Sequence, residues 1–216
     1  MNLHFSGLAK SLAATAVLAL STSASAVTLL TLQTEPAFTL GPQSTSAPCI
    51  IAGTQCQNPA NFGFTNFVQG GATALDEVSP EYTVSQLPFL QFVVAIDVNT
   101  TRAAGETLQL FELKNLTTGE LLYSFTGPAL IGAPLANNGN GYADWSLNTF
   151  DLSGLAPTDE IQFHAVWDGA SDGAESFFLV STAPIPEPET YALYLAGLGA
   201  AWFAKRRRNA STRRAG

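Results

Sequence analysis

The sequence predicts an all-β fold for the central part of this chain: an antiparallel, two-sheet sandwich of jelly-roll type. The apolar segments there are short, rich in Val, Phe, Thr and Leu, and separated by Gly, Pro, Asn and Asp. This pattern is typical of strands joined by turns. No central segment repeats its apolar residues with a helical period. Many short strands at such spacing indicate a sandwich.

The segments predicted as strands are Val27–Gln33, Phe62–Val68, Ala72–Val78, Phe89–Val98, Thr107–Lys114, Glu120–Thr126, Tyr142–Leu147, Glu160–Trp167 and Glu175–Ser181. Glu160–Trp167 alternates apolar and polar residues, as a half-buried strand does. Phe89–Val98 is almost entirely apolar, which predicts a central strand covered on both faces. In Thr107–Lys114 the alternation slips at Leu110–Phe111, which predicts a bulge.

Turn chemistry separates these strands. Thr117–Glu120 contains Gly119 and predicts a hairpin. Asn137–Gly141 and Ser153–Asp159 predict longer turns, because they are rich in Asn, Gly, Ser and Pro. Gln33–Ala60 holds both cysteines and several prolines and is expected to be an irregular excursion.

The N-terminal segment has the layout of a secretory signal peptide. One lysine precedes an apolar stretch, Ser11–Leu20, and Ala24-Ser25-Ala26 has the small-x-small pattern that signal peptidase cleaves. We expect residues 1–26 to be removed by cleavage after Ala26. The alternative is an uncleaved anchor helix, but about ten apolar residues are too few to span hydrocarbon.

The C-terminal segment, residues 184–216, has three parts in order. Pro186-Glu187-Pro188-Glu189 cannot hold a helix, because proline fixes its own φ and lacks an amide donor. An apolar run, Tyr191–Ala204, follows and predicts a short transmembrane helix at 190–204. The basic cluster Lys205–Arg208 then fixes its orientation. A helix of this length spans roughly 21 Å, against about 30 Å of hydrocarbon, which favours temporary insertion; an ordinary weak tail anchor is the alternative.

This order of parts resembles the C-terminal sorting signal of the PEP-CTERM proteins, within the tail alone. The resemblance implies recognition of Pro186, Glu187 and Pro188 by an exosortase, a membrane protease. It also implies that the apolar helix holds the substrate in the membrane and that Lys205, Arg206, Arg207 and Arg208 set its orientation. These residues are acted upon and perform no catalysis. The family setting implies a bacterium that makes exopolysaccharide.

Charge is divided sharply along the chain. Residues 27–183, the predicted exported domain, contain fifteen Asp and Glu but only Arg102 and Lys114 as basic residues. Such a domain is repelled by phosphate backbones, so nucleic acid is not an expected partner. The negative charge of the domain favours solubility and can attract divalent cations. The alternative is that these carboxylates simply form a solvated surface.

Cys49 and Cys56 are the only cysteines of the chain. In an exported protein a Cys49–Cys56 disulfide is expected. It closes a short loop and contributes on the order of 2–3 kcal/mol to the free energy of unfolding.

The sequence contains few candidate catalytic residues, so we expect that the protein is not an enzyme and binds no cofactor. His4 leaves with the signal peptide, and His164 on a predicted strand is expected to be an ordinary, partly exposed side chain. The chain has no His-Glu-x-x-His and no phosphate-binding glycine loop. The alternative is a carbohydrate-binding or glycan-active exported enzyme that uses paired carboxylates about 5–9.5 Å apart.

Two weaker site hypotheses concern the last third of the domain. Asp168, Asp172 and Glu175 lie in one Gly-containing loop and offer the hard oxygen ligands that Ca²⁺ prefers. Asn138, Asn140 and Asp144 partly match a calcium loop, but Ala136 replaces the leading Asp, and a plain turn explains them as well. Tyr142, Trp145 and Trp167 offer flat faces for sugar rings if exposed, or fill the core.

From these patterns we expect an exported protein, processed at both ends and delivered to the cell surface or extracellular matrix. Its expected role is structural or adhesive, in an exopolysaccharide or biofilm setting. The expected partners are an exosortase-type protease and exopolysaccharide, with transient membrane insertion.

Overall fold

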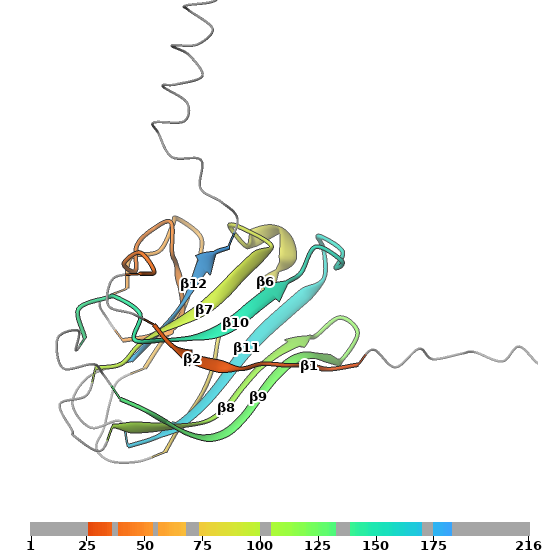
Figure 1. The fold of residues 1–216 in the computed structure, drawn as a ribbon. Coiled ribbons are helices and arrows are strands. Elements are labelled where there is room, and N and C mark those ends of the chain that lie inside the picture. Colours follow the sequence, from red (N-terminus) through yellow and green to blue (C-terminus); the bar gives the residue numbers. More distant parts are fainter. Residues whose placement is uncertain are drawn as a thin grey trace, which may run out of the picture.

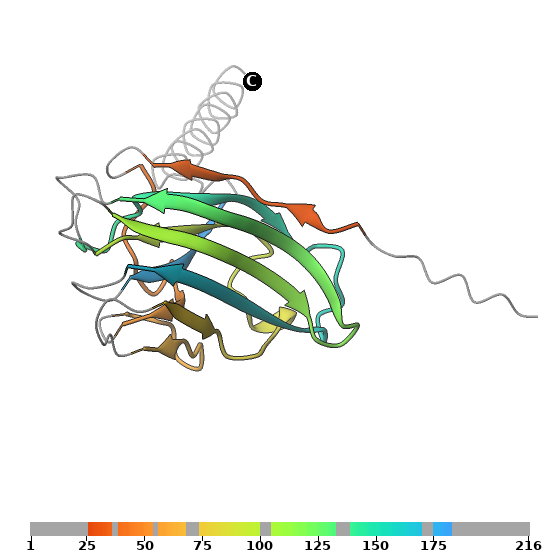
Figure 2. The same cartoon turned by 90° about the horizontal axis from the view of Figure 1, so that it is seen from below.

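The computed structural model describes residues 26–35, 39–53, 56–67, 74–99, 105–132, 139–169 and 175–182. Within these ranges the chain forms two β-sheets packed face to face, and a single short 3₁₀ helix, η1 (Val84–Gln86), is the only helical element. Figures 1 and 2 show the two layers from directions at right angles. The predicted all-β sandwich is therefore confirmed for the described part of the chain.

Each layer is a mixed sheet of six strands. Sheet A has the order β1 (Thr28–Leu29), β9 (Glu120–Ile131), β8 (Glu106–Asn115), β11 (Glu160–Asp168) and β5 (Leu75–Val78), and β6 (Tyr82–Thr83) also pairs with β11. Sheet B has the order β2 (Leu32–Thr34), β10 (Trp145–Asp151), β7 (Gln91–Asp97), β12 (Ser176–Ser181), β3 (Cys49–Ala52) and β4 (Thr65–Asn66).

The prediction of purely antiparallel sheets is wrong at two edges. β1 runs parallel to β9, and β3 runs parallel to β4, whereas the other pairings are antiparallel. The physical reason lies in the first predicted strand, Val27–Gln33, which divides into β1 and β2. The short break between them, at Leu30 and Thr31, carries the chain from sheet A to sheet B. One edge segment therefore joins both layers.

Each predicted strand overlaps an observed strand, and several details are confirmed. β7 is central in sheet B, as its apolar sequence predicted. The register between β8 and β9 shifts between Leu108 and Leu110, at the position of the expected bulge. The β8–β9 hairpin turns at Leu116–Gly119, where Gly119 has a positive φ of 76°.

Two strands, β3 and β6, were not predicted. β3 lies within the segment expected to be irregular, between Pro48 and Gly53. All four of its residues are buried, because sheet B is covered on both faces at this point. A four-residue apolar run without alternation carries too little periodicity to be recognised as a strand.

The core between the sheets is rich in aromatic rings. Phe111 of sheet A lies 6.2 Å from Phe150 and 5.8 Å from Phe177 of sheet B, measured between ring centroids. Phe163 and Trp167 of β11 are also fully buried there. These rings bury large apolar areas and pack the two layers together.

A second, smaller apolar cluster covers the outer face of sheet B. It contains Cys49, Ala95 and Phe178 from the sheet, together with Ala47 from the segment before β3. The excursion between β2 and β4 thus forms a partial third layer over sheet B. The outer face of sheet A has no such cover among the described residues: β9, β8, β11 and β5 lie side by side, nearest the viewer, in Figure 2.

Candidate functional site

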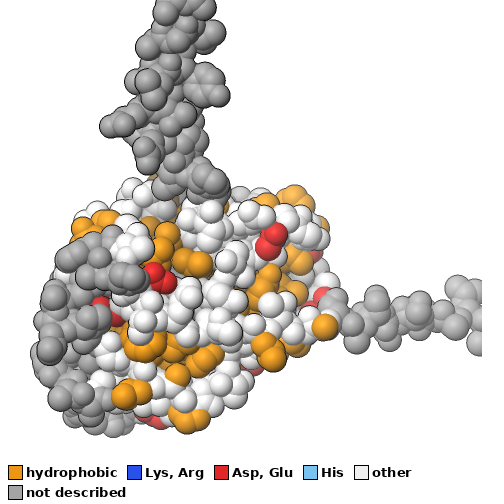
Figure 3. All heavy atoms as spheres, in the orientation of Figure 1, with side chains coloured by type: hydrophobic (Ala, Val, Ile, Leu, Met, Phe, Trp, Pro, Cys, Tyr) orange, Lys and Arg blue, Asp and Glu red, His pale blue; other side chains and the backbone are white. Residues whose placement is uncertain are grey.

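The surface of the described part is acidic. Lys114 is the one Lys or Arg within the described ranges, because Arg102 and the other basic residues fall outside them. On the face shown in Figure 3, acidic side chains (red) lie among apolar ones (orange). This surface offers no basic stripe for phosphate binding.

The residues of the predicted sorting signal, Pro186–Pro188 and Lys205–Arg208, lie outside the described residues, as does Ala24 of the predicted cleavage site. Ala26 is described and exposed, directly before β1. A search of the described ranges for a helix with the length and hydropathy needed to cross a membrane finds none. The predicted helix at 190–204 lies outside those ranges.

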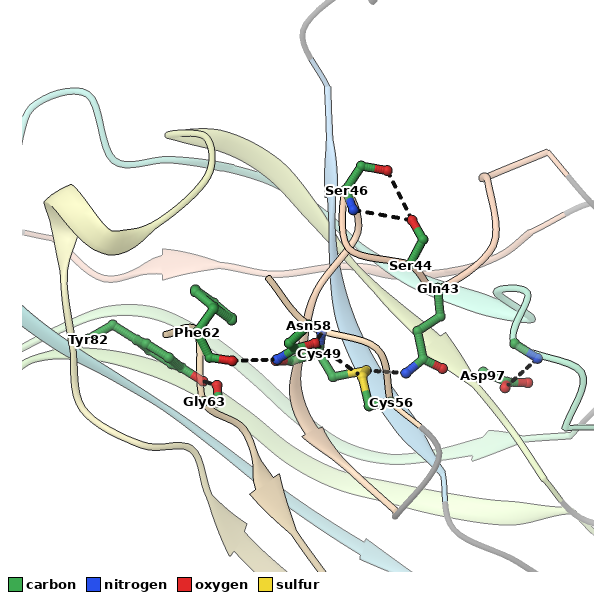
Figure 4. Close-up of a disulfide and its surroundings, with 11 residues drawn as sticks. Gln43, Ser44, Ser46, Cys49, Cys56, Asn58, Phe62, Gly63, Tyr82 and Asp97 are labelled. Carbon is green, nitrogen blue, oxygen red and sulfur yellow. Dashed lines mark hydrogen bonds between the residues drawn. A yellow bond between two sulfur atoms is a disulfide. The ribbon is translucent and has the colours of Figure 1, made fainter. Parts of the chain in front are cut away.

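The predicted disulfide is present: Cys49 and Cys56 are bonded, with a Cα–Cα distance of 6.3 Å (Figure 4). The side chain of Asn58 forms hydrogen bonds with the backbone next to this disulfide. Its Oδ1 accepts a hydrogen bond from the Cys49 amide (2.8 Å), and its Nδ2 donates to the carbonyls of Cys49 (2.9 Å) and Phe62 (3.1 Å). The disulfide and Asn58 together fix the end of the excursion against β3.

The three aromatic residues proposed for sugar binding do not form one exposed platform. Trp167 is fully buried in the core, so its ring is not available to a ligand, and the core interpretation applies to it. Trp145 is half-buried against the core and donates from Nε1 to the Gly132 carbonyl at 2.9 Å. Tyr142 is half-exposed in the segment before β10.

Of the three residues proposed for calcium, only Asp168 and Glu175 are described. Asp168 Oδ2 accepts a hydrogen bond from Gln109 Nε2 at 2.7 Å, whereas Glu175 is buried and accepts from Trp167 Nε1 at 3.2 Å. Asp172, like Asn138 of the second calcium-like segment, lies outside the described residues. Within the described ranges, no three His, Cys, Asp or Glu side chains are placed to hold a metal ion.

A row of polar side chains from β5, β11 and β8 crosses the open face of sheet A. His164 Nε2 lies 2.6 Å from Asp76 Oδ1, and its Nδ1 lies 3.6 Å from Glu112 Oε2. Lys114 Nζ lies 3.4 Å from the same Glu112 oxygen. Both ring nitrogens of His164 therefore face carboxyl groups of neighbouring strands. The alternation of β11 placed His164 on this face, but only strand pairing shows its neighbours.

Buried carboxylates gather at the end of the sandwich where β7 ends and β8, β10 and β12 begin. They are Asp97, Glu106, Asp144 and Glu175. The pKa of Asp97 is raised to about 7, mainly by burial and also by the charges of Asp144 and Glu175, while the hydrogen bond from the Gly141 amide opposes the rise. Asp144 Oδ2 accepts from the Val98 amide at 2.9 Å, which ties the start of β10 to the end of β7. No sequence signal marked this group, because its members are far apart along the chain.

The opposite end carries a small hollow of about 140 Å³. It is lined by apolar residues of β9 and of the β10–β11 turn, with Ala26 and Asp151 at its edge. The Tyr123 hydroxyl donates to the Asp151 carbonyl and accepts from the Asp151 amide, both at 2.9 Å. These two bonds close the base of the hollow by joining β9 to β10.

Comparison with known proteins returns no relative. The chain matches no family model, no curated protein and no solved structure.

Proposed function

We propose that this chain is an exported bacterial protein of the cell surface or extracellular matrix, sorted by an exosortase-type membrane protease. In this proposal the signal peptide of residues 1–26 directs export, and residues 184–216, with the transmembrane helix at 190–204, form a temporary sorting signal. The body between them is a jelly-roll-like sandwich with a structural or adhesive role among exopolysaccharides.

The observation that carries the proposal is the ordered tail: Pro186-Glu187-Pro188, an apolar run, and Lys205–Arg208 at the end. The body is compatible with this destination. Its Cys49–Cys56 disulfide belongs to an oxidising compartment, and its described surface is strongly acidic. The outer face of sheet A, which is not covered by other described residues and carries His164, Asp76 and Glu112, is a surface available for contact with a matrix.

The test is mass spectrometry of the protein isolated from its native host, comparing the normal chain with Glu187→Ala. The normal chain is expected to have lost both its first 26 residues and its tail. The variant is expected to keep the tail and stay with the membrane fraction. Glu189→Ala is the matched control, because it removes a neighbouring carboxylate while leaving Pro186–Pro188 intact. An intact tail on the normal chain, or equal processing of the Glu187 variant, contradicts the proposal.

A further inference from the structure

The two cysteines of the Cys49–Cys56 disulfide differ in their access to solvent. Cys49 is fully buried in the apolar cluster on the outer face of sheet B, where it pairs with Phe178 of β12. Cys56 packs at the margin of the same cluster and is only partly buried. An external thiolate attacks only a sulfur atom that it can reach. Attack on this disulfide is therefore directed to Cys56.

The polar groups beside the two sulfur atoms also differ. Gln43 Nε2 donates a hydrogen bond to Cys49 Sγ (Figure 4). Cys56 Sγ instead lies 3.3 Å from Asn58 Oδ1, which is a hydrogen-bond acceptor. A donor stabilises negative charge on a sulfur atom, whereas an acceptor favours a protonated thiol. When the disulfide opens, these neighbours therefore favour Cys49 as the sulfur that carries the charge.

We propose that this disulfide is a one-sided thiol–disulfide exchange site, in which an external thiolate attacks Cys56 Sγ and Cys49 leaves as a thiolate that Gln43 stabilises. The bond between the two cysteines breaks, and a bond forms between Cys56 Sγ and the incoming sulfur. The electron pair of the broken bond stays on Cys49, so Cys49 is reduced and the incoming sulfur is oxidised. In the reverse step, the Cys49 thiolate attacks Cys56 and expels the external thiolate.

The fold keeps Cys49 in place while the bond is open. β3 remains paired with β12, and Asn58 bonds to the amide and the carbonyl of Cys49 at 2.8 and 2.9 Å. The Gln43 amide is held in turn by the Gly141 carbonyl at 2.8 Å. The Cys49 thiolate therefore stays beside its donor and within reach of Cys56. This chemistry does not depend on the sorting signal.

Reduced glutathione, added to the purified full chain in detergent micelles, tests the direction of attack. The reaction is quenched with N-ethylmaleimide, and tandem mass spectrometry locates both adducts, since Cys49 and Cys56 are the only cysteines of the chain. Chains with glutathione on Cys56 and maleimide on Cys49 are expected to outnumber the reverse form about tenfold or more, because burial excludes attack on Cys49. In concentrated urea, where burial is lost, the two forms are expected in similar amounts. An excess of glutathione on Cys49, or the same ratio in both conditions, overturns the proposal.

Single-cysteine variants give a second measurement that does not require the mixed disulfide to accumulate. With oxidised glutathione, Cys56 in Cys49→Ser is expected to react about tenfold or more faster than Cys49 in Cys56→Ser, because access decides the rate. Tryptophan fluorescence checks that both variants are folded, and the same reactions in concentrated urea are the control. Equal rates in the two folded variants overturn the proposal.

Gln43→Leu tests the role assigned to the donor. Reduction of the disulfide by glutathione is expected to slow about threefold or more, because a hydrogen bond to the charged Cys49 sulfur is lost. Ser46→Ala is the matched control, since Ser46 lies in the same segment and bonds to Ser44. An unchanged rate in Gln43→Leu, or the same slowing in Ser46→Ala, overturns the role of Gln43.

Discussion

Asn58 makes three hydrogen bonds with one side-chain amide, and two of them go to the backbone of Cys49. The side chain thus substitutes for a neighbouring strand at the point where the excursion returns to sheet B. The backbone groups that bond to Asn58 are partly buried, so water does not fully replace these hydrogen bonds when the side chain is removed.

Asn58→Ala is expected to lower the free energy of unfolding by about 2–3 kcal/mol, since each lost hydrogen bond contributes roughly 1 kcal/mol. Urea denaturation under non-reducing conditions measures this change. Asn66→Ala is the control, because Asn66 is exposed at the sheet edge, and its effect is expected to stay within about 0.5 kcal/mol. Equal effects of the two substitutions contradict the role assigned to Asn58.

Asp97 makes the stability of the fold depend on pH in a defined direction. Its pKa is about 7 in the folded chain, against an ordinary value of 3.8. Because the folded-state pKa is raised, its contribution to stability is fully present below about pH 4 and is lost as pH rises to about 7. The loss is on the order of 2–4 kcal/mol.

The free energy of unfolding of Asp97→Asn, relative to the normal chain, is therefore expected to rise as pH increases from 4 to 8. Urea titrations at several pH values measure this difference. Asp151→Asn is the control. Hydrogen bonds from Ser153 and Gln91 lower the pKa of Asp151, so its stabilising effect is lost only as pH falls below about 4, and the difference for this variant is expected to stay flat from pH 4 to 8. A flat difference for Asp97→Asn contradicts the assignment.

At the scale of elements, the β8–β9 pair shows how a bulge is built. The register shifts at Gln109, and the opposite strand has Gly127 at this point. A Cβ atom added to Gly127 would lie only 2.2 Å from the Leu108 carbonyl oxygen, so the two backbones approach more closely than any side chain allows. Pro128 follows, in the part of β9 that extends beyond its pairing with β1, and offers no amide there with which to recruit another chain.

Gly127→Ala is expected to destabilise the fold by about 2 kcal/mol or more, because backbone atoms on both strands have to shift. Gly154→Ala, in the β10–β11 turn, is the control: no atom lies within 4 Å of an added Cβ there. That change is expected to be neutral or slightly stabilising, since alanine restricts the unfolded chain. Thermal unfolding of the two variants side by side distinguishes the outcomes, and equal melting temperatures contradict the steric argument.

At the scale of the whole molecule, the two sheets are held together by one aromatic core. Phe111 contacts rings from both layers, and it is fully buried. In the described part no α-helix lies between the layers, and this aromatic core joins them directly.

Phe111→Ala is expected to cost about 3–5 kcal/mol, from lost apolar burial and the cavity that remains. Because both sheets share this core, tryptophan fluorescence and far-ultraviolet circular dichroism are expected to report one coincident transition. Leu130→Ala is the control, since Leu130 is 62% exposed. Two separated transitions in the Phe111 variant contradict a shared core.

Local patterns were sufficient for much of the fold. The alternation of Glu160–Trp167 and the apolar run of Phe89–Val98 predicted β11 and the central β7, because a period of two is a property of neighbouring residues. The slip at Leu110–Phe111 likewise predicted the bulge. β3 and the parallel edge at β1 could not be predicted in this way, since they depend on pairing with distant parts of the sequence: Ile51 lies opposite Phe177, and Thr28 lies opposite Tyr123.

The candidate sites also differ in whether local sequence or tertiary structure was needed to recognise them. The cysteine pair followed from composition and compartment, whereas for Trp167 the core was the expected place, and the sugar-platform alternative stayed open until the structure showed the ring to be fully buried. Asp97 looked like an ordinary acidic residue at the end of an apolar strand. Its burial beside Asp144 and Glu175 arises only when β7, β10 and β12 are brought to one end of the sandwich.

The sequence alone determined that this chain has an acidic, strand-rich body between two segments of signal-like composition, because composition, charge order and alternation are local quantities. The tertiary structure alone decided which side chains lose contact with water and which charges become neighbours. The physical reason is that desolvation and Coulomb energy depend on distances in space, which long-range strand pairing sets.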